Sequence, residues 1–260
     1  MDFGPDVTWR VVSAKTAGTS HMETNTPCQD HYLTREVTTS HGAVVLIAVV
    51  SDGAGSAVCA EDGANEVCAA IVGIVTETLD KYDHLEDIGD VHVRSWFAAA
   101  RERLRILACK SEHEIRDYSA TAIVAVVGDK SSVYAHVGDG GAVIRQAQNQ
   151  DFSVAVWPES GEYANETFFV TDPNVAEHVN ITRLGCVDDV ILFSDGLQRL
   201  ALHAATHSPH APFFNPLVNH IRTSKKSTDV LSSELECFLR SETVSIRTDD
   251  DKSLVIGCRI

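Results

Sequence analysis

The chain has 260 residues, enough for one large domain or two small ones, and its hydrophobic share of 44% is ordinary for a globular protein. Its formal net charge of -16 would repel a phosphate backbone, which argues against a nucleic-acid partner. No apolar run approaches about 20 residues, and no basic patch followed by an apolar run opens the chain, so we expect neither a membrane span nor a signal peptide. The seven cysteines are scattered singly, which predicts reduced thiols in a cytoplasmic protein.

The first half of the chain predicts two short strands, a long buried strand and two helices. Residues 8–14 have the pattern of a strand, and a polar, turn-rich loop leads from there into a second strand near Tyr32. Residues 43–50 are apolar and mostly β-branched, which predicts a strand buried on both faces. Small and apolar residues recur at helical spacing over 60–79 and again over 91–114, which predicts two helices.

From residue 120 the pattern changes to strands. Apolar runs separated by turn residues predict one hairpin over 120–137 and another over 142–157. We expect two further short strands at 168–170 and 180–183, and a core strand at 190–193.

The last quarter is predicted to be mainly helical. Helical segments are expected near 197–205, 213–222 and 229–241, and a strand at 253–258 ends the chain. Three prolines, Pro209, Pro212 and Pro216, are expected to divide this stretch. Many antiparallel strands, with helices grouped in two blocks, predict a single α+β domain built as a layered sandwich.

Acidic residues recur at the ends of the predicted strands. Any one Asp-Gly pair is ordinarily a tight turn. Several carboxylates that converge at one sheet edge, however, repel one another unless cations lie between them. Ligand sets made only of oxygen suit magnesium or manganese. The acidic residues at strand ends are Asp52, Asp139, Asp195 and the run 249–251.

Other catalytic or binding patterns fit the sequence less well. Gly53-Ala-Gly55 follows a strand and precedes a helix, as in a dinucleotide-binding fold, but Val58 occupies the place of the third glycine and the next element is a second helix. The sequence has no phosphate-binding loop motif and no His-Glu-x-x-His. Among the twelve histidines we retain only His21, which lies in the first polar loop.

Six short motifs follow one another along the chain: Cys28-Gln-Asp30, 51–55, 119–122, 137–139, 193–197 and 250–253. In this order and spacing they resemble the metal-dependent protein phosphatases (type 2C serine/threonine phosphatases), in particular bacterial-type members. This resemblance implies a four-layer αββα sandwich, two antiparallel β-sheets flanked by helix pairs, with a two-metal site at one edge. It implies a hydrolase that cleaves phosphomonoesters of serine and threonine with a water activated between two metals.

The resemblance also implies roles for the acidic residues. Asp52 would bridge both metals, and the carbonyl of Gly53 would bind the second one. Asp195 and Asp250 would hold the first metal. Asp251 stands where the family commonly has asparagine, so the choice between Asp250 and Asp251 stays open.

The metals would be Mn²⁺ or Mg²⁺, two in number. Asp30 would act on the second metal directly or through its waters. Asp139, together with Asp195, is similar to the pair that binds a third, weaker metal in bacterial-type members. The segment 146–180 stands where the family carries a variable flap, and it is either a plain connector or a lid that contacts substrate.

Two departures from the family pattern leave an alternative open. The family usually has an arginine in the first loop to hold the substrate phosphate, and His21 stands near that place, with Lys15 or Arg10 as possible substitutes. Ala54 stands where many members have a histidine. The main expectation is an enzyme acting on phosphorylated proteins, with a cognate serine/threonine kinase as a candidate partner; the alternative is a pseudophosphatase that binds a phosphoprotein or kinase without hydrolysis.

Overall fold

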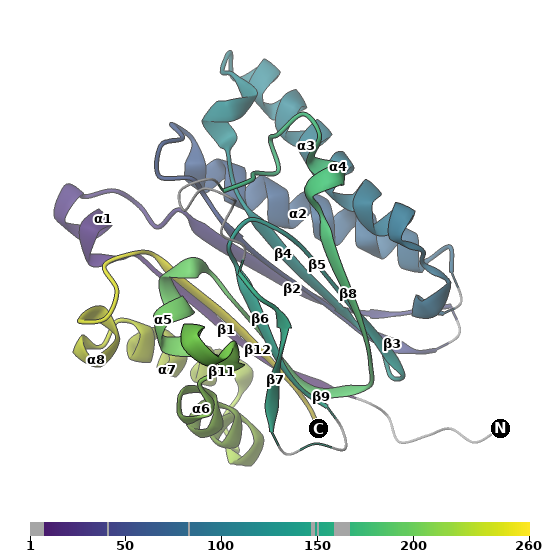
Figure 1. Ribbon diagram of the computed structural model, residues 1–260, viewed down its shortest axis with the longest axis vertical. Helices are drawn as coiled ribbons and strands as arrows, with labels where there is room; N and C mark the ends of the chain where they lie inside the picture. Colours follow the sequence, from purple (N-terminus) through teal and green to yellow (C-terminus); the bar gives the residue numbers. More distant parts are fainter. Residues whose placement is uncertain (1–7, 41, 83, 147–148, 150, 159–166) are drawn as a thin grey trace.

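Two five-stranded antiparallel sheets lie face to face, with helices covering the outer side of each (Figure 1). This arrangement comes from a computed structural model. The protein is therefore an α+β sandwich, as the sequence predicted. None of the helices within the described residues combines the length and the apolar character that crossing a bilayer requires. The structure describes residues 8–40, 42–82, 84–146, 149, 151–158 and 167–260.

The first sheet has the strand order β2-β3-β4-β5-β8 and is covered by two long helices. Helix α2 (Ala60–Leu79) has the predicted bounds. Helix α3 (Asp90–Lys110) is shorter than predicted, since the chain turns at Glu112, whose φ is 58°. The strands are β2 (Asp30–Thr38), β3 (Val44–Asp52), β4 (Ala122–Val127), β5 (Ser131–Val137) and β8 (Asn180–Gly185).

The second sheet has the order β1-β12-β9-β6-β7, so strands from the two ends of the chain pair with each other. Both predicted hairpins, β4–β5 and β6–β7, are confirmed. The strands are β1 (Trp9–Thr16), β6 (Gly141–Gln146), β7 (Phe152–Val156), β9 (Val187–Phe193) and β12 (Lys252–Arg259). The helices of this half are α5 (Gln198–Ala201), α6 (Ala211–Thr223), α7 (Thr228–Leu239) and α8 (Glu242–Ser245).

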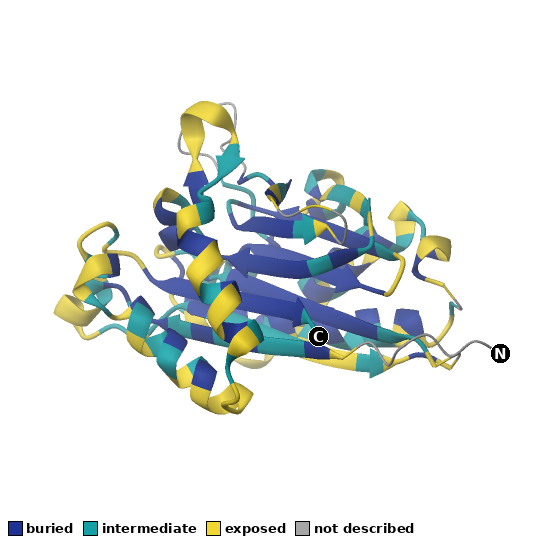
Figure 2. Ribbon diagram, turned by 90° about the horizontal axis from the view of Figure 1, so that it is seen from below, coloured by how far each residue is buried: buried dark blue, intermediate teal, exposed yellow. Residues whose placement is uncertain are grey.

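Strand β3 is buried on both faces, as predicted. Val45 and Ile47 pack with the apolar faces of α2 and α3. Leu46 and Ala48, which point to the other side because side chains alternate along a strand, pack between the two sheets. Figure 2 shows the same division, with buried strands in the middle and exposed residues on the outer faces of the helices.

Several local predictions were wrong. The first polar loop contains a short helix, α1 (Thr19–Thr24), which ends at Asn25 in the left-handed conformation. Residues 168–170 form no strand; Val170 N donates a single hydrogen bond to the carbonyl of Ala120 (2.8 Å). The region 197–205 is broken by a small hairpin of β10 (Leu202–His203) and β11 (Ser208–Pro209).

The helix predicted at 213–222 is confirmed as α6; Pro216, one of the three prolines expected to divide this stretch, lies inside it without ending it. A proline there removes one backbone hydrogen bond. The helix continues because its other face buries Phe214, Val218 and Ile221 against the second sheet. The remaining short helices are η1 (Leu85–Asp87), η2 (Ile115–Tyr118), α4 (Val175–His178), η3 (Asp195–Leu197) and η4 (Ala204–Thr206).

Candidate metal centre

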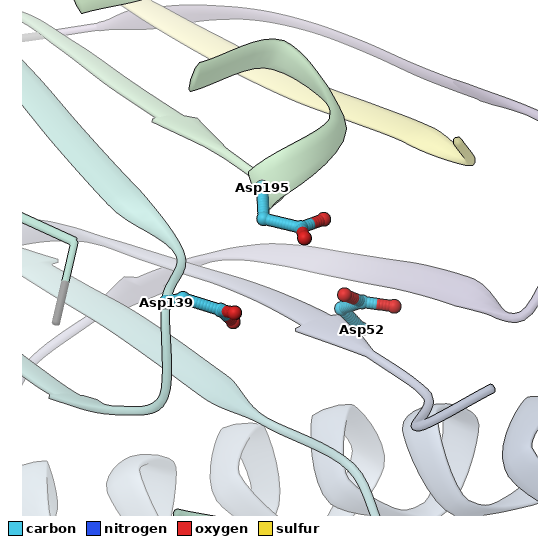
Figure 3. A group of neighbouring side chains, drawn as sticks. All are labelled: Asp52, Asp139 and Asp195. Carbon is cyan, nitrogen blue, oxygen red and sulfur yellow. The ribbon is translucent and has the colours of Figure 1, made fainter. Parts of the chain in front are cut away.

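Three aspartates from different strand ends meet at one edge of the sandwich. Asp52 ends β3, Asp139 follows β5, and Asp195 follows β9. Their carboxylates point toward one another (Figure 3), and one oxygen from each lies within 4.8 Å of the others. The convergence expected from the sequence is therefore present in the geometry.

Two glycines shape this edge. Gly138 has a φ of 100°, a left-handed conformation, and a Cβ atom there would lie 2.5 Å from Cγ2 of Thr121. Glycine at this position therefore lets the chain turn so that Asp139 faces the other acids. Gly53 touches the start of α2, where an added Cβ would lie 2.5 Å from the carbonyl oxygen of Ala60.

The three carboxylates line a polar cavity of about 290 Å³. No lysine or arginine is among the described residues that line it, so their negative charge has no protein cation facing it across this space. The other lining residues are His21, Gln29, Gly53, Ala54, Gly55, Ser56, Thr121, Thr167, Phe169, Asp250 and Asp251.

The acids of this cavity are hard to ionise together. Burial raises the pKa of Asp52 well above its ordinary value, and the neighbouring charges of Asp30 and Asp195 raise it further. Burial also raises the pKa of Asp195 to about 7, with repulsion from Asp139 and Asp250 adding to the effect. A divalent cation between the carboxylates would remove this repulsion.

Asp30 lies behind the cavity lining. It is fully buried and is the strand partner of Asp52 in the pairing of β2 with β3. Ser194 Oγ donates a hydrogen bond to its Oδ2 (2.6 Å), but its Oδ1 has no hydrogen-bond partner among the described residues. Burial raises the pKa of Asp30 to about 6. A buried carboxylate oxygen without a partner fits a cation, or a water held by one.

The two candidates in the terminal acidic run lie in different surroundings. Asp251 is buried and accepts three hydrogen bonds, from the backbone N–H of Gly18 (2.7 Å), the backbone N–H of Gln29 (2.6 Å) and Nδ1 of His21 (2.9 Å). Both residues line the cavity, but Asp250 is exposed and its side chain accepts one hydrogen bond, to Oδ1 from the N–H of Asp251 (2.8 Å). The geometry therefore favours Asp250 over Asp251 as a metal ligand.

The basic residues near the first loop are placed differently from one another. Arg10 donates to the carbonyls of Ile221 (2.8 Å) and Ser224 (2.6 Å), and Lys15 donates to the carbonyl of Asp30 (2.7 Å). Neither lines the cavity, whereas His21 does. Of the three candidates for holding a phosphate, the structure brings only His21 to the site.

Lys252 is a residue that sequence reasoning missed. It is 1% exposed, and its Nζ donates to the carbonyl of Asp250 (2.9 Å). Burial lowers the pKa of Lys252, and the nearby carboxylates of Asp251 and Asp250 oppose that shift. The lysine thus holds the backbone of Asp250 in place. Its only signal in the sequence was its position directly after three acids.

The expected flap reaches the cavity at its described end. Thr167 Oγ1 donates a long hydrogen bond (3.4 Å) to Oδ2 of Asp139, and Phe169 lines the cavity. The hydrophilic stretch 161–166, on which the expectation of a lid rested, lies outside the described residues.

Comparisons with known proteins agree with this geometry. The family model described as Protein phosphatase 2C matches residues 17–240. Serine/threonine-protein phosphatase 3 of Escherichia coli (strain K12) is 32% identical over 253 residues, which cover 96% of this chain and 98% of that protein.

Two solved structures share the fold at low sequence identity. The serine/threonine phosphatase Stp1 from Staphylococcus aureus has a TM-score of 0.58 at 15% identity and covers 99% of this chain and 97% of its own. RsbX in complex with magnesium has a TM-score of 0.56 at 12% identity and covers 99% of this chain and 98% of its own.

Proposed function

Because this chain belongs to the protein phosphatase 2C family and is a metal-dependent serine/threonine protein phosphatase, we propose that Asp52, Asp195 and Asp250 hold its divalent cations. The observation that supports this assignment most is the approach of carboxylate oxygens from Asp52, Asp139 and Asp195 to within 4.8 Å of one another. The charges of Asp30, Asp195 and Asp139 all act on Asp52, and we propose that Asp52 contacts more than one ion. The carbonyl of Gly53, which also lines the cavity, would complete this set.

The ions are proposed to be Mn²⁺ or Mg²⁺, since every candidate ligand is an oxygen. When bound, two such cations lower the pKa of a shared water toward neutrality and neutralise charge on the phosphoryl group. Asp30 would hold water or an ion from behind through its unpartnered Oδ1. Asp139 would share a third, weaker ion with Asp195.

His21 is proposed to contact the substrate phosphate. Of the described residues that line the cavity, it is the one whose side chain can carry a positive charge. Its Nδ1 is held by Asp251 at 2.9 Å, which fixes the ring and leaves Nε2 as the other nitrogen able to meet a ligand. An imidazole held in this way offers one directed hydrogen bond where an arginine would offer a bidentate pair.

The substrates are phosphoproteins, and a serine/threonine kinase that generates them is the partner we propose. We further propose one phosphatase domain over the whole chain, with 146–180 as its variable flap. The pairing of β1 with β12 supports a single domain, because both ends of the chain build one sheet. The cytoplasm as the compartment stays a prediction; all seven cysteines are free thiols, as that prediction requires.

The alternative, a binding module without hydrolysis, is motivated by His21 and Ala54. The cavity nevertheless keeps a carboxylate at Asp52, Asp139, Asp195 and Asp250. A binding module would have no need to hold so many unpaired acids against their mutual repulsion. We therefore favour hydrolysis.

The test is hydrolysis of a phosphothreonine peptide with and without Mn²⁺, for the wild type, Asp52→Asn and the control Asp229→Asn. Asp229 lies exposed in the first turn of α7, so its variant changes the charge by the same amount away from the cavity. We expect Asp52→Asn to lose more than the roughly 10–100-fold that removal of an outer-shell partner costs. Equal Mn²⁺-dependent rates in Asp52→Asn and Asp229→Asn would overturn the assignment.

A further inference from the structure

A second cavity, larger than the acidic one, opens between α6 and α7. Its volume is about 420 Å³. Its floor is the outer face of the second sheet, at Val12 of β1 and Ile256 of β12. Its walls include Phe213 and Leu217 of α6 and Leu235 of α7. None of the acids proposed as metal ligands lines it. We call it the helix-pair cavity.

The packing of the two helices explains why this space is open. Helix α7 packs along β1, whereas α6 contacts both β12 and β1 less closely. The cavity lies between the two helices. Pro212 and Pro216 lie on the wall of this gap, and a proline inside a helix weakens the local backbone hydrogen bonding. Val12 and Ile256 on the floor are fully buried by their neighbours, and the exposed apolar surface of the cavity includes the half-buried Leu217 and Phe238.

The charges at the rim of this cavity are not balanced. Glu234 is already paired, since it accepts hydrogen bonds from Nε2 of His220 (3.0 Å) and from Lys226. Arg247 also lines the cavity and is exposed, and its guanidinium has no hydrogen-bond or ion-pair partner in the part of the chain that the structure describes. The rim therefore offers one free cation beside an apolar interior.

We propose that the helix-pair cavity binds a compact, mostly aromatic molecule that carries one anionic group. Its volume lies in the range of about 300–1,000 Å³ that small-molecule sites occupy. Phe213 and Phe238 present aromatic rings to it, and flat rings pack well against such faces. The planar guanidinium of Arg247 would receive the anionic group at the rim, where the anion keeps contact with water.

The position of the cavity connects it to the metal centre. Thr243, Val244 and Arg247 form part of its lining, and the chain then runs directly into Asp249 and Asp250. A ligand that displaces the α8 segment would therefore move Asp250. This connection to catalysis rests on the proposed function, whereas binding to the cavity does not.

Binding is tested by fluorescence titration of the whole protein with 1-anilinonaphthalene-8-sulfonate, an aromatic body with one sulfonate. We expect saturable binding, weakened about tenfold or more in Arg247→Gln, since a hydrogen bond to a charged group contributes about 1.5–3 kcal/mol. The matched control Arg199→Gln removes an exposed arginine of α5 that does not line the cavity and should bind like the wild type. N-phenyl-1-naphthylamine has the same ring system without the sulfonate and should bind the wild type about tenfold more weakly than the sulfonate probe does. Its affinity should be the same for the wild type and for Arg247→Gln, because it has no anionic group to meet the arginine.

Filling the cavity is a second, independent test. Leu217→Trp adds a large side chain at a half-buried wall position and should abolish the titration signal while circular dichroism shows a folded protein. Unsaturable binding, equal affinity in Arg247→Gln and Arg199→Gln, or equal affinity for the two probes would each overturn the proposal. If Leu217→Trp does not fold, the arginine pair and the two probes still decide it.

The connection to catalysis is read from Mn²⁺-dependent hydrolysis at saturating sulfonate probe. We expect the rate to change in the wild type and in Arg199→Gln, and to change less in Arg247→Gln at the same probe concentration. An unchanged rate in the wild type would refute the connection and leave the binding site. A wild-type protein that binds the probe but hydrolyses nothing would count against the proposed function instead.

Discussion

The acidic residues near the two ends of strand β9 differ in their charge balance. At its start, Asp189 is fully buried between two arginines: Nε of Arg145 donates to Oδ2 (2.6 Å), and Nη2 of Arg222 donates to Oδ1 (2.8 Å). Just past its end, Asp195 faces Asp52 and Asp139, and in the described part of the chain no lysine or arginine lines the cavity between them. One strand thus carries a carboxylate paired with arginines and another that faces only carboxylates.

The difference indicates what each group is for. An ion pair whose hydrogen bonds are all made needs no further ion to balance its charge, whereas removing one partner leaves an uncompensated charge. A cluster of half-buried acids that face one another is stabilised when it takes up protons or metal ions. The raised pKa values of Asp52 and Asp195 show the same effect, because they mean that the surroundings favour the protonated carboxyl groups. We therefore interpret the Asp189 group as structural and the acidic cavity as a candidate cation-binding site.

The largest expected effect is on the free energy of unfolding, which should fall when the acid between the arginines is neutralised but not when an acid of the cavity is. Asp189→Asn leaves the half-buried Arg145 and Arg222 without their counterion, which should lower the free energy of unfolding by up to about 3–5 kcal/mol. Asp52→Asn removes the same charge from the acidic cavity, and metal-free Asp52→Asn should be no less stable than the wild type because repulsion is relieved. Urea unfolding with a chelator present measures both. A comparable loss in the two variants would end the distinction.

Metal should stabilise the protein through the acidic cavity only. At a free Mn²⁺ concentration of 100 times the dissociation constant, binding to the folded state adds about 2.7 kcal/mol. The thermal midpoint should therefore rise with Mn²⁺ in the wild type and in Asp189→Asn, each relative to its own metal-free form. Asp195→Asn should show much less of this rise. A rise of wild-type size in Asp195→Asn would place the ion elsewhere.

The sequence predicted one of these groups and not the other. The acids of the cavity follow strands, and acids at strand ends of one sandwich meet at an edge, so their convergence could be expected. The pairing of Asp189 with arginines could not, because Arg145 and Arg222 lie 44 and 33 residues away and meet it only through the second sheet and α6. Short-range patterns predict where a side chain leaves the backbone, but tertiary packing decides what it meets.

The same limit explains the local errors. Helix α2 has a long apolar stripe, and its bounds were predicted to the residue. Both hairpins were predicted as hairpins, without exact bounds. Residues 168–170 have the residue types of a strand, but they hold only one hydrogen bond to Ala120 and no regular partner. The choice between Asp250 and Asp251 depended on hydrogen bonds to Gly18 and Gln29, more than 200 residues away, which no pattern near Asp251 reveals.

The raised pKa values of the cavity acids should add a characteristic slope to the pH dependence of the metal-free protein. Asp195 and Asp30 have folded pKa values of about 7 and about 6, above the unfolded value of about 3.9. The folded state therefore holds protons that the unfolded state has lost, so their stabilisation is complete below pH 4 and is lost as pH rises to about 7. Each group contributes a slope of up to about 1.4 kcal/mol per pH unit.

Comparison with Asp195→Asn isolates this slope, because the other titrating groups are common to both proteins. Free energies of unfolding in chelator, measured from pH 4.5 to 7.5, should fall more steeply in the wild type than in Asp195→Asn. Saturating Mn²⁺ should remove the difference in steepness by holding the carboxylates ionised. A wild type that becomes more stable relative to Asp195→Asn as pH rises would contradict the assignment of these raised pKa values.

The smallest expected effect concerns His21, which lines the acidic cavity without being one of its acids. His21 is held by Asp251, an acid already satisfied by two backbone N–H groups, and not by the acids that face one another. If it contributes one hydrogen bond to the substrate phosphate, His21→Ala should raise KM about tenfold, the equivalent of about 1–1.5 kcal/mol, with a smaller change in kcat. Stabilisation by Mn²⁺ should be unchanged, since no proposed metal ligand is removed. A fall in kcat as large as that of Asp52→Asn would instead give His21 a part in the chemical step. The imidazole would then serve as a proton-transfer group, in addition to the carboxylates of the cavity.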